Sequence, residues 1–263
     1  MTFINKLFSL KNKVAVITGG SGDLGFAIAS GYWNAGATVI LAARDRVKLD
    51  KAIRQLAGED RNRAYAHVVD VANSEQVEKM MSEISQRFGK IDILVTAAGI
   101  QHRSSILSFE HKAWNDVLTT NLTGTFYCAQ IAARVMTAQA HGRIVMISSL
   151  TAEIGIPNIA AYAASRGGIR QLCKTMAVEL AGYGITVNCI GPGRFKTRMT
   201  EDLFANKATR EKFLAMIPMR RAGVPADLTG ISIFLASDSS SYVTGQTFYI
   251  DGGWLAGGGN ILG

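Results

Sequence analysis

The chain has 263 residues, 48% of them hydrophobic, with 27 glycines and only 4 prolines. This length suits one large α/β domain spanning residues 1–263, and the composition excludes a disordered chain. The formal net charge of +8 comes from scattered basic residues. Because no basic helix or stripe stands out, an anionic small molecule is favoured over nucleic acid as the partner.

Targeting and redox signals favour the cytoplasm. No apolar run reaches the roughly 18 residues that a membrane span needs, and the first residues lack the basic and apolar regions of a secretory signal. The three cysteines, Cys128, Cys173 and Cys189, are widely spaced in apolar stretches. They predict buried thiols in a reducing compartment, with no metal site. We therefore expect a cytoplasmic protein that binds no membrane.

Short β-branched runs alternate with longer amphipathic segments along the chain. The predicted strands are residues 14–17, 38–41, 64–69, 91–95, 143–147, 186–190 and 248–250. The predicted helices run from the first glycine turn to Asn34, then over 47–56, 74–88 with Ser74 as the N-cap, 114–138 and 161–181. Continuously apolar strands separated by helices predict a doubly wound α/β sheet of about seven parallel strands, with helices on both faces.

Residues 195–221 follow the sixth predicted strand and show no clear periodicity. Open α/β sheets bind ligands at the ends of their strands, so this segment is predicted to be a substrate lid. The alternative is an ordinary surface excursion.

A glycine-rich turn, Thr18–Gly25, runs from the first strand straight into a helix. Glycines let the backbone approach a pyrophosphate, and the exposed N–H groups and dipole of the helix stabilise its charge. A carboxylate there would repel the pyrophosphate unless it points away or caps the helix, and we expect Asp23 to form the cap. The turn predicts dinucleotide contacts from Gly19, Ser21, Gly22, Asp23 and Leu24.

The end of the second strand discriminates between the two nicotinamide cofactors. NAD binders usually place an acidic residue there, whereas this chain has Ala42-Ala43 followed by Arg44. A small residue and a fork-shaped cation suit the 2′-phosphate of NADP, so NADP(H) is predicted over NAD(H). The alternative is that Arg44 is a solvated charge and that Asp45 is a displaced NAD-binding acid.

With these features the chain resembles the short-chain dehydrogenase/reductase family over nearly its whole length. The resemblance is carried by the glycine turn, the Thr-Ala-Ala-Gly at 96–99, the thirteen-residue separation of Ser149 and Tyr162, and the segments 191–197 and 243–254. It implies a Rossmann-type fold and further cofactor contacts from Asp70, Val71, Ala98, Gly99, Tyr162, Arg166, Pro192, Gly193 and Thr197. Segments 98–103, 114–117 and 195–197 and Glu153 most resemble gluconate 5-dehydrogenases and related ketogluconate reductases.

The resemblance also implies hydride transfer between the nicotinamide and a carbonyl or carbinol carbon. Tyr162 would act as general acid, Ser149 would polarise the substrate oxygen, and Asn121 would anchor a water in the proton relay. The pKa of a tyrosine phenol is ordinarily about 10, so a neighbouring cation is needed to favour the phenolate.

The family's Tyr-x-x-x-Lys motif reads Tyr162-Ala-Ala-Ser-Arg166 in this chain. Four residues along a helix place the cation on the same face as Tyr162. A guanidinium effectively never deprotonates, so Arg166 is expected to keep the electrostatic and ribose-binding roles and to impair the proton relay. An active enzyme is therefore the first hypothesis, and a catalytically impaired NADP-binding partner or sensor is the second.

The substrate and the assembly are less specified. Arg103 would bind the carboxylate and Glu153 the hydroxyls of a sugar acid. The alternatives are a hydrophobic ketone or biosynthetic intermediate, with Arg103 and Glu153 as surface charges or paired with each other.

The family is commonly oligomeric, and the apolar Trp254-Leu255 near the C-terminus suggests packing against a second subunit. A homodimer or homotetramer is expected.

Overall fold

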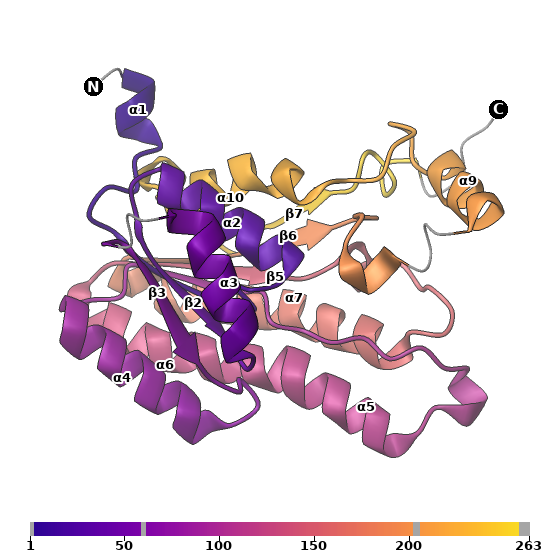
Figure 1. Cartoon of the computed structure of the whole chain (residues 1–263), viewed down its shortest axis with the longest axis horizontal. Coiled ribbons are helices and arrows are strands. Elements are labelled where there is room, and N and C mark those ends of the chain that lie inside the picture. Colours follow the sequence, from indigo (N-terminus) through magenta and orange to yellow (C-terminus); the bar gives the residue numbers. More distant parts are fainter. Residues whose placement is uncertain (1–2, 59–61, 202–205, 258–263) are drawn as a thin grey trace.

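Seven parallel strands form one sheet in the order β3-β2-β1-β4-β5-β6-β7 (Figure 1). The structure is a computed structural model that describes residues 3–58, 62–201 and 206–257. The predicted doubly wound fold is confirmed, and each predicted strand is found within two residues of its expected bounds. The strands are β1 (Val14–Thr18), β2 (Thr38–Ala43), β3 (Ala64–Val68), β4 (Ile93–Thr96), β5 (Gly142–Ile147), β6 (Ile185–Pro192) and β7 (Thr247–Ile250).

Helices cover both faces of the sheet and enclose two apolar cores. One face is covered by α2 (Asp23–Asn34), α3 (Arg46–Ala57) and α10 (Thr229–Ala236). The other is covered by α4 (Ser74–Phe88), α6 (Gly124–Gln139) and α7 (Ala160–Leu180). Outside these layers lie α1 (Phe3–Leu7), α5 (His111–Leu118) and α9 (Lys207–Ala215). Because the strands are shielded from water on both sides, they need no alternation of polar residues.

Three helical features differ from the sequence-based expectation. The segment predicted as one helix over 114–138 is α5 and α6, joined by a π-helical turn over Thr119–Thr123. The N-cap of α4 is Asn73, whose side chain accepts from the Gln76 N–H at 3.0 Å, rather than Ser74. The eight-residue helix α10 was not predicted because its residues are largely apolar and no amphipathic stripe marks it.

Burial tests two further expectations. Cys128, Cys173 and Cys189 are buried and free, as predicted. Trp254 is only 3% exposed within the single chain, so its ring packs inside the subunit, and the expected contact of this segment with a second subunit stays a prediction. Among the described residues, no helix is long and apolar enough to cross a membrane, and no cluster of His, Cys, Asp or Glu could hold a metal ion.

The start of the central strand β1 is held by a buried carboxylate. Asp92 is 4% exposed, and its side chain accepts from the Val14 N–H at 2.7 Å. The Asp92 N–H donates in turn to the Val14 carbonyl at 3.0 Å. Lys90 Nζ lies 3.0 Å from the same carboxylate. Asp92 therefore satisfies a buried backbone donor between β1 and β4.

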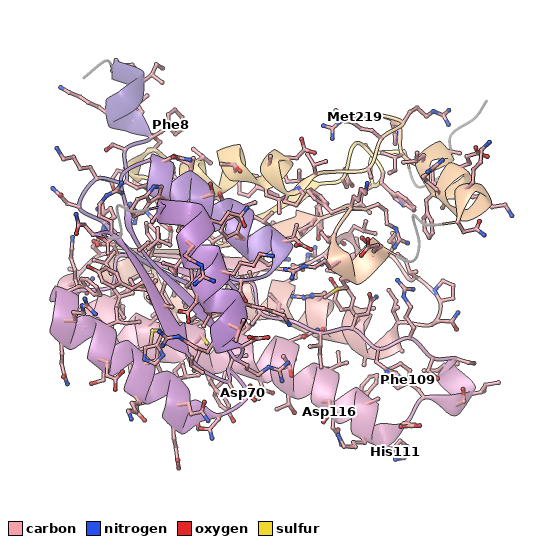
Figure 2. All side chains as sticks on the ribbon, in the orientation of Figure 1. Phe8, Asp70, Phe109, His111, Asp116 and Met219 are labelled. Carbon is pink, nitrogen blue, oxygen red and sulfur yellow. The ribbon has the colours of Figure 1, made fainter. Side chains whose placement is uncertain are left out.

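Replacing Asp92 by Ala should lower the free energy of unfolding by about 1–3 kcal/mol, because the Val14 N–H is left buried without an acceptor. Urea denaturation at fixed protein concentration measures this difference. Asp92→Asn keeps an acceptor oxygen and should recover most of the loss. The control is Asp116→Ala on α5, an exposed carboxylate paired with Lys112 (Figure 2), which should cost no more than about 1 kcal/mol. Equal losses for Asp92→Ala and Asp116→Ala would contradict the role of Asp92.

Candidate active site

A cavity of about 550 Å³ opens at the carboxyl ends of the strands, where the strand order reverses between β1 and β4. Crevices at such reversal points are the usual ligand sites of open α/β sheets. Every residue predicted to contact the dinucleotide lines this cavity, and Ser149 lines it too. The set is Gly19, Ser21, Gly22, Asp23, Leu24, Arg44, Asp70, Val71, Ala98, Gly99, Tyr162, Arg166, Pro192, Gly193 and Thr197.

Close backbone packing shapes the glycine turn. Gly19 has a φ of +66°, and a Cβ there would lie 2.7 Å from backbone atoms of Ala97 and Ala98. A Cβ on Gly25 would overlap the Gly19 carbonyl. Glycine at both positions therefore lets the first turn of α2 approach the end of β4. At this first turn the Asp23 and Leu24 N–H groups have no preceding helical carbonyl to bind, so they form a cradle for an anion.

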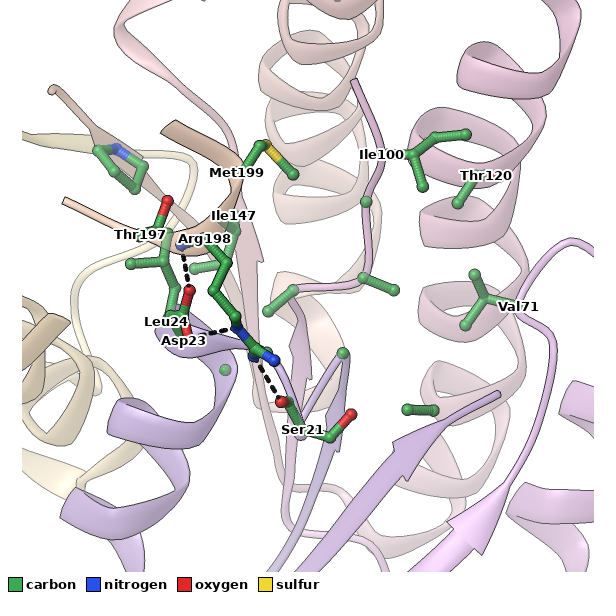
Figure 3. Close-up of a pocket in the computed structure, with 18 of the residues that line it drawn as sticks. Ser21, Asp23, Leu24, Val71, Ile100, Thr120, Ile147, Thr197, Arg198 and Met199 are labelled. Carbon is green, nitrogen blue, oxygen red and sulfur yellow. Dashed lines mark hydrogen bonds and ion pairs between the residues drawn. The ribbon is translucent and has the colours of Figure 1, made fainter. Parts of the chain in front are cut away.

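The prediction that Asp23 caps α2 was wrong. Its carboxylate accepts from the Arg198 backbone N–H at 2.7 Å and from Arg198 Nε at 2.9 Å (Figure 3). Arg198 Nη2 donates to the Ser21 carbonyl at 3.0 Å. Asp23 is thus paired with a cation 175 positions away, which offsets the repulsion that its charge would exert on a phosphate at this helix N-terminus.

The acidic neighbour of Arg44, Asp45, is bound to residues of α3 rather than to Arg44. The Asp45 side chain N-caps α3 by accepting from the Lys48 N–H at 3.0 Å, and Lys48 Nζ lies 3.1 Å from it. These contacts, the backbone hydrogen bond first, lower the pKa of Asp45. Arg44 is exposed at the cavity and forms no ion pair with any residue in the described ranges. Lys48, which the sequence analysis missed, adds a second cation to this wall.

Tyr162 and Arg166 lie one turn apart on α7. Arg166 is 4% exposed, and its Cζ lies 4.8 Å from the centroid of the Tyr162 ring. Arg166 Nη1 donates to the Ile147 carbonyl at 2.7 Å, while its Nε has no hydrogen-bond partner among the described residues. A Cβ on Gly99 would come within 2.5 Å of Arg166 Nη2. The glycine therefore makes room for a guanidinium held beside the phenol ring.

Ser149 and Asn121 are both buried. Ser149 begins a short 3₁₀ turn, and its hydroxyl oxygen accepts from the Thr151 N–H at 3.2 Å. The Asn121 amide donates to the Ile100 carbonyl at 3.0 Å and to the Ser165 hydroxyl at 3.1 Å. Its side-chain oxygen accepts from the Ile100 N–H at 2.8 Å. Asn121 therefore ties the end of β4 to α7 and does not line the cavity, and its role with a relay water stays a prediction.

Of the three residues predicted to contact the substrate, Ser149 lines the cavity, whereas Arg103 and Glu153 lie outside its lining. Glu153 accepts from the Tyr249 hydroxyl at 2.7 Å and lies 3.0 Å from Arg170 Nη2. Burial first, and then this carboxylate, raise the pKa of Tyr249. Glu153 is thus paired with Arg170 rather than with Arg103. Arg103 is exposed and forms no ion pair within the part of the chain that the structure describes.

The predicted lid supplies cavity residues that the sequence analysis did not single out. Phe195, Arg198, Met199 and Thr200 line the cavity beside Thr197. The Thr200 hydroxyl donates to the Phe195 carbonyl, and the Lys196 N–H donates to the Gly223 carbonyl at 2.9 Å. These bonds hold the start of the segment at the carboxyl end of β6. Residues 202–205 of the predicted lid lie outside the described ranges.

Comparisons with known proteins agree with this geometry. A family model described as "Enoyl-(Acyl carrier protein) reductase" matches residues 21–255. The chain is 36% identical to 5-keto-D-gluconate 5-reductase of Escherichia coli, covering 96% of this chain and 99% of the relative. It is 37% identical to a 3-oxoacyl-(acyl-carrier-protein) reductase of Thermotoga maritima, covering 93% and 98%. A gluconate 5-dehydrogenase of Burkholderia cenocepacia, solved in complex with NADP and tartrate, superposes with a TM-score of 0.92 at 38% identity, covering 96% and 99%.

The pairing of Asp23 with Arg198 predicts how each variant binds NADPH. Arg198→Met leaves an uncompensated carboxylate at the helix N-terminus and should weaken NADPH binding by about 3- to 10-fold at low salt. The double variant Asp23→Asn/Arg198→Met should recover most of that loss, because the repulsive charge is gone. Fluorescence titration of NADPH measures both. Arg46→Met, which removes an exposed cation paired with Asp50, is the control. Equal binding by Arg198→Met and the unchanged protein would disprove the compensation.

Proposed function

The chain belongs to the short-chain dehydrogenase/reductase family and is an oxidoreductase, and on that premise we propose a substrate and a cofactor for it. It transfers a hydride between NADP(H) and a carbonyl or secondary-alcohol carbon of a sugar acid. The observation that carries the proposal is one cavity that gathers a phosphate cradle, the unpaired Arg44, and the Ser149, Tyr162 and Arg166 side chains.

The preference for NADP(H) is supported by the wall after β2. Arg44 presents a free guanidinium, and the acid beside it is occupied by Lys48 and the α3 backbone. A guanidinium fork binds a phosphate through two parallel charge-assisted hydrogen bonds. A carboxylate engaged as an N-cap is a poor acceptor for ribose hydroxyls. The related Burkholderia cenocepacia structure is described with NADP bound.

The protein groups divide the chemistry as follows. The bound cofactor supplies or accepts the hydride at its nicotinamide. Tyr162 donates a proton to the substrate oxygen during reduction, and the Ser149 hydroxyl holds that oxygen by a hydrogen bond. Arg166, whose Cζ lies 4.8 Å from the centroid of the Tyr162 ring, holds a positive charge over the ring that gives up this proton. Its buried position also excludes water from one side of the reacting groups.

Compared with the lysine of the family motif, Arg166 keeps the positive charge beside Tyr162 but cannot pass on a proton. A guanidinium stays protonated at any working pH, so the proton that returns to Tyr162 after the reduction comes from water rather than through residue 166. Arg166 therefore acts as a fixed cation. The enzyme is slower in this step than a lysine-bearing relative, and it remains a catalyst; none of the relatives described above is named as a non-catalytic protein.

A sugar acid is favoured as substrate by the relatives named for gluconate and ketogluconate and by the free cation Arg103 beyond the β4 end. Glu153 can contact substrate hydroxyls only by sharing its carboxylate with Tyr249 and Arg170. A ketone on an acyl chain is the rival, since one relative is named as a 3-oxoacyl reductase. The start of the lid, already at the cavity, would cover either substrate.

The cellular setting is part of the same proposal. Three buried, unpaired cysteines suit a reducing compartment, and we place the protein in the cytoplasm.

Exposed apolar side chains at Val178, Tyr183 and Tyr242 suit contact with a second copy in a homodimer or homotetramer.

Arg44→Ala should raise the KM for NADPH by about 10- to 100-fold, because two charge-assisted hydrogen bonds to the 2′-phosphate are lost. The KM for NADH should change by no more than about 3-fold, because NADH lacks that phosphate. Steady-state kinetics with both cofactors measures the ratio. The same substitution at Arg46, which is paired with Asp50, is the control. A matching rise for NADPH and NADH would refute the assignment of Arg44.

The proposed reaction is tested by NADPH oxidation with three ketone classes: a keto-sugar acid, a neutral ketose and a 3-oxoacyl thioester. We expect turnover with the keto-sugar acid and little with the thioester. Arg166→Lys should raise kcat by about 10-fold or more, since general acid–base steps contribute about 100- to 10,000-fold. Tyr162→Phe is the inactive control. Tight NADPH binding without turnover of any ketone would overturn the enzymatic proposal.

A further inference from the structure

Arg194 is a cation that the proposed mechanism does not use, and it stands at the carboxyl end of β6. The preceding residue, Gly193, donates its N–H to the Ile250 carbonyl at 2.9 Å. The Arg194 carbonyl accepts from the Gly223 N–H at 2.8 Å. The backbone at Arg194 is thus fixed on both sides, so the direction of its side chain is set by the fold.

Two aromatic rings hold the Arg194 side chain. Its Cζ lies 4.6 Å from the centroid of the Phe213 ring on α9 and 5.3 Å from that of the Trp254 ring near the C-terminus. The buried Nε has no hydrogen-bond partner, and no carboxylate among the described residues forms an ion pair with Arg194. A desolvated guanidinium without an anion is unfavourable unless a ligand supplies one.

The acids nearest to Arg194 are already engaged elsewhere. Arg194 lines a second cavity of about 340 Å³, which shares Phe195 with the main one. Of the two acids in its wall, Asp227 lies 2.7 Å from Arg221, and Asp251 accepts the N–H groups of two later residues at 2.9 Å. Neither carboxylate therefore forms an ion pair with Arg194, whose guanidinium has no counter-ion among the described residues of this wall.

Two residues of the proposed site act electrostatically on Arg194. Burial first, and then the positive charge of Arg103, lower the pKa of the Arg194 guanidinium to about 10, with the Tyr162 phenol acting in the opposite direction. Arg194 stays charged at neutral pH. Its chain neighbours, Gly193 and Phe195, both line the cavity that holds Tyr162.

We infer that Arg194, with Arg103, binds the carboxylate of the substrate and so orients its carbonyl toward Tyr162. The inference rests on the proposed function and names the residue that selects acidic over neutral ketones. An anion between the two guanidinium groups removes their mutual repulsion and pairs the half-buried Arg194. The planar fork, held between two rings, loses little conformational freedom when it binds.

The test compares 5-keto-D-gluconate with D-fructose, a neutral six-carbon ketose, as substrates with NADPH. Arg194→Met keeps an unbranched aliphatic side chain and removes the guanidinium group with its charge. It should raise the KM for the acid by about 10- to 100-fold relative to the KM for the ketose. Arg194→Lys should recover part of that loss, and Arg103→Ala should lower the same preference. Arg210→Met removes an exposed cation from the same helix as Phe213 and is the control.

Calorimetric binding of D-gluconate to the NADP complex gives a readout that needs no turnover. Weaker gluconate binding by Arg194→Met, with unchanged NADP binding, supports the inference even if no ketone is reduced and the proposed reaction fails. Equal rises in KM for both ketones, together with a lower melting temperature, would show that Arg194 only packs α9 against the C-terminal segment. That result would overturn the inference, as would no gluconate binding by the unchanged protein.

Discussion

The close backbone approach of Gly19 to Ala97 and Ala98 is the contact on which the site depends. It brings the end of β1 against the end of β4, where the sheet order reverses, and it leaves no space for a side chain. The helix N-terminus of α2 then faces into the crevice. All later features of the cavity, including the cations that line it, are placed relative to this contact. The doubly wound sheet supplies the crevice, and the glycine makes it narrow enough for backbone donors to serve as ligands.

The cationic side chains that line the cavity differ in the contacts that hold them. Arg44 forms no ion pair with any described residue, and Lys48 is held by Asp45. Arg198 is committed to Asp23 and Ser21. Arg166 is buried and anchored to the Ile147 carbonyl. A net charge of +8 therefore does not act as one diffuse field. The individual cations act locally: some are paired with nearby acids, and others form no ion pair among the described residues.

The sequence was most informative where function depends on neighbouring residues. The glycine turn, Arg44 and the Tyr162–Arg166 spacing are local patterns, and their elements could be placed from apolar runs alone. The Asp23–Arg198 and Glu153–Tyr249 contacts join residues 175 and 96 positions apart, and no local pattern encodes such pairs. Asn73 replaced Ser74 as a cap because both residue types cap well. The π-helical turn at Asn121 was invisible because the apolar periodicity continues through it.

The walls of the cavity come from distant parts of the chain, and this has a consequence for synthesis. The turn at 19–25 and the segment 192–200 both line the cavity, and the two are joined by the Asp23–Arg198 contact. During translation the glycine turn is synthesised long before the segment 192–200. The second edge of β1 also stays unpaired until β4 has been synthesised. Non-local pairing of this kind forms slowly, because chain closure costs entropy before contacts compensate. A nascent chain shorter than about two hundred residues therefore contains the glycine turn but lacks part of the cavity wall.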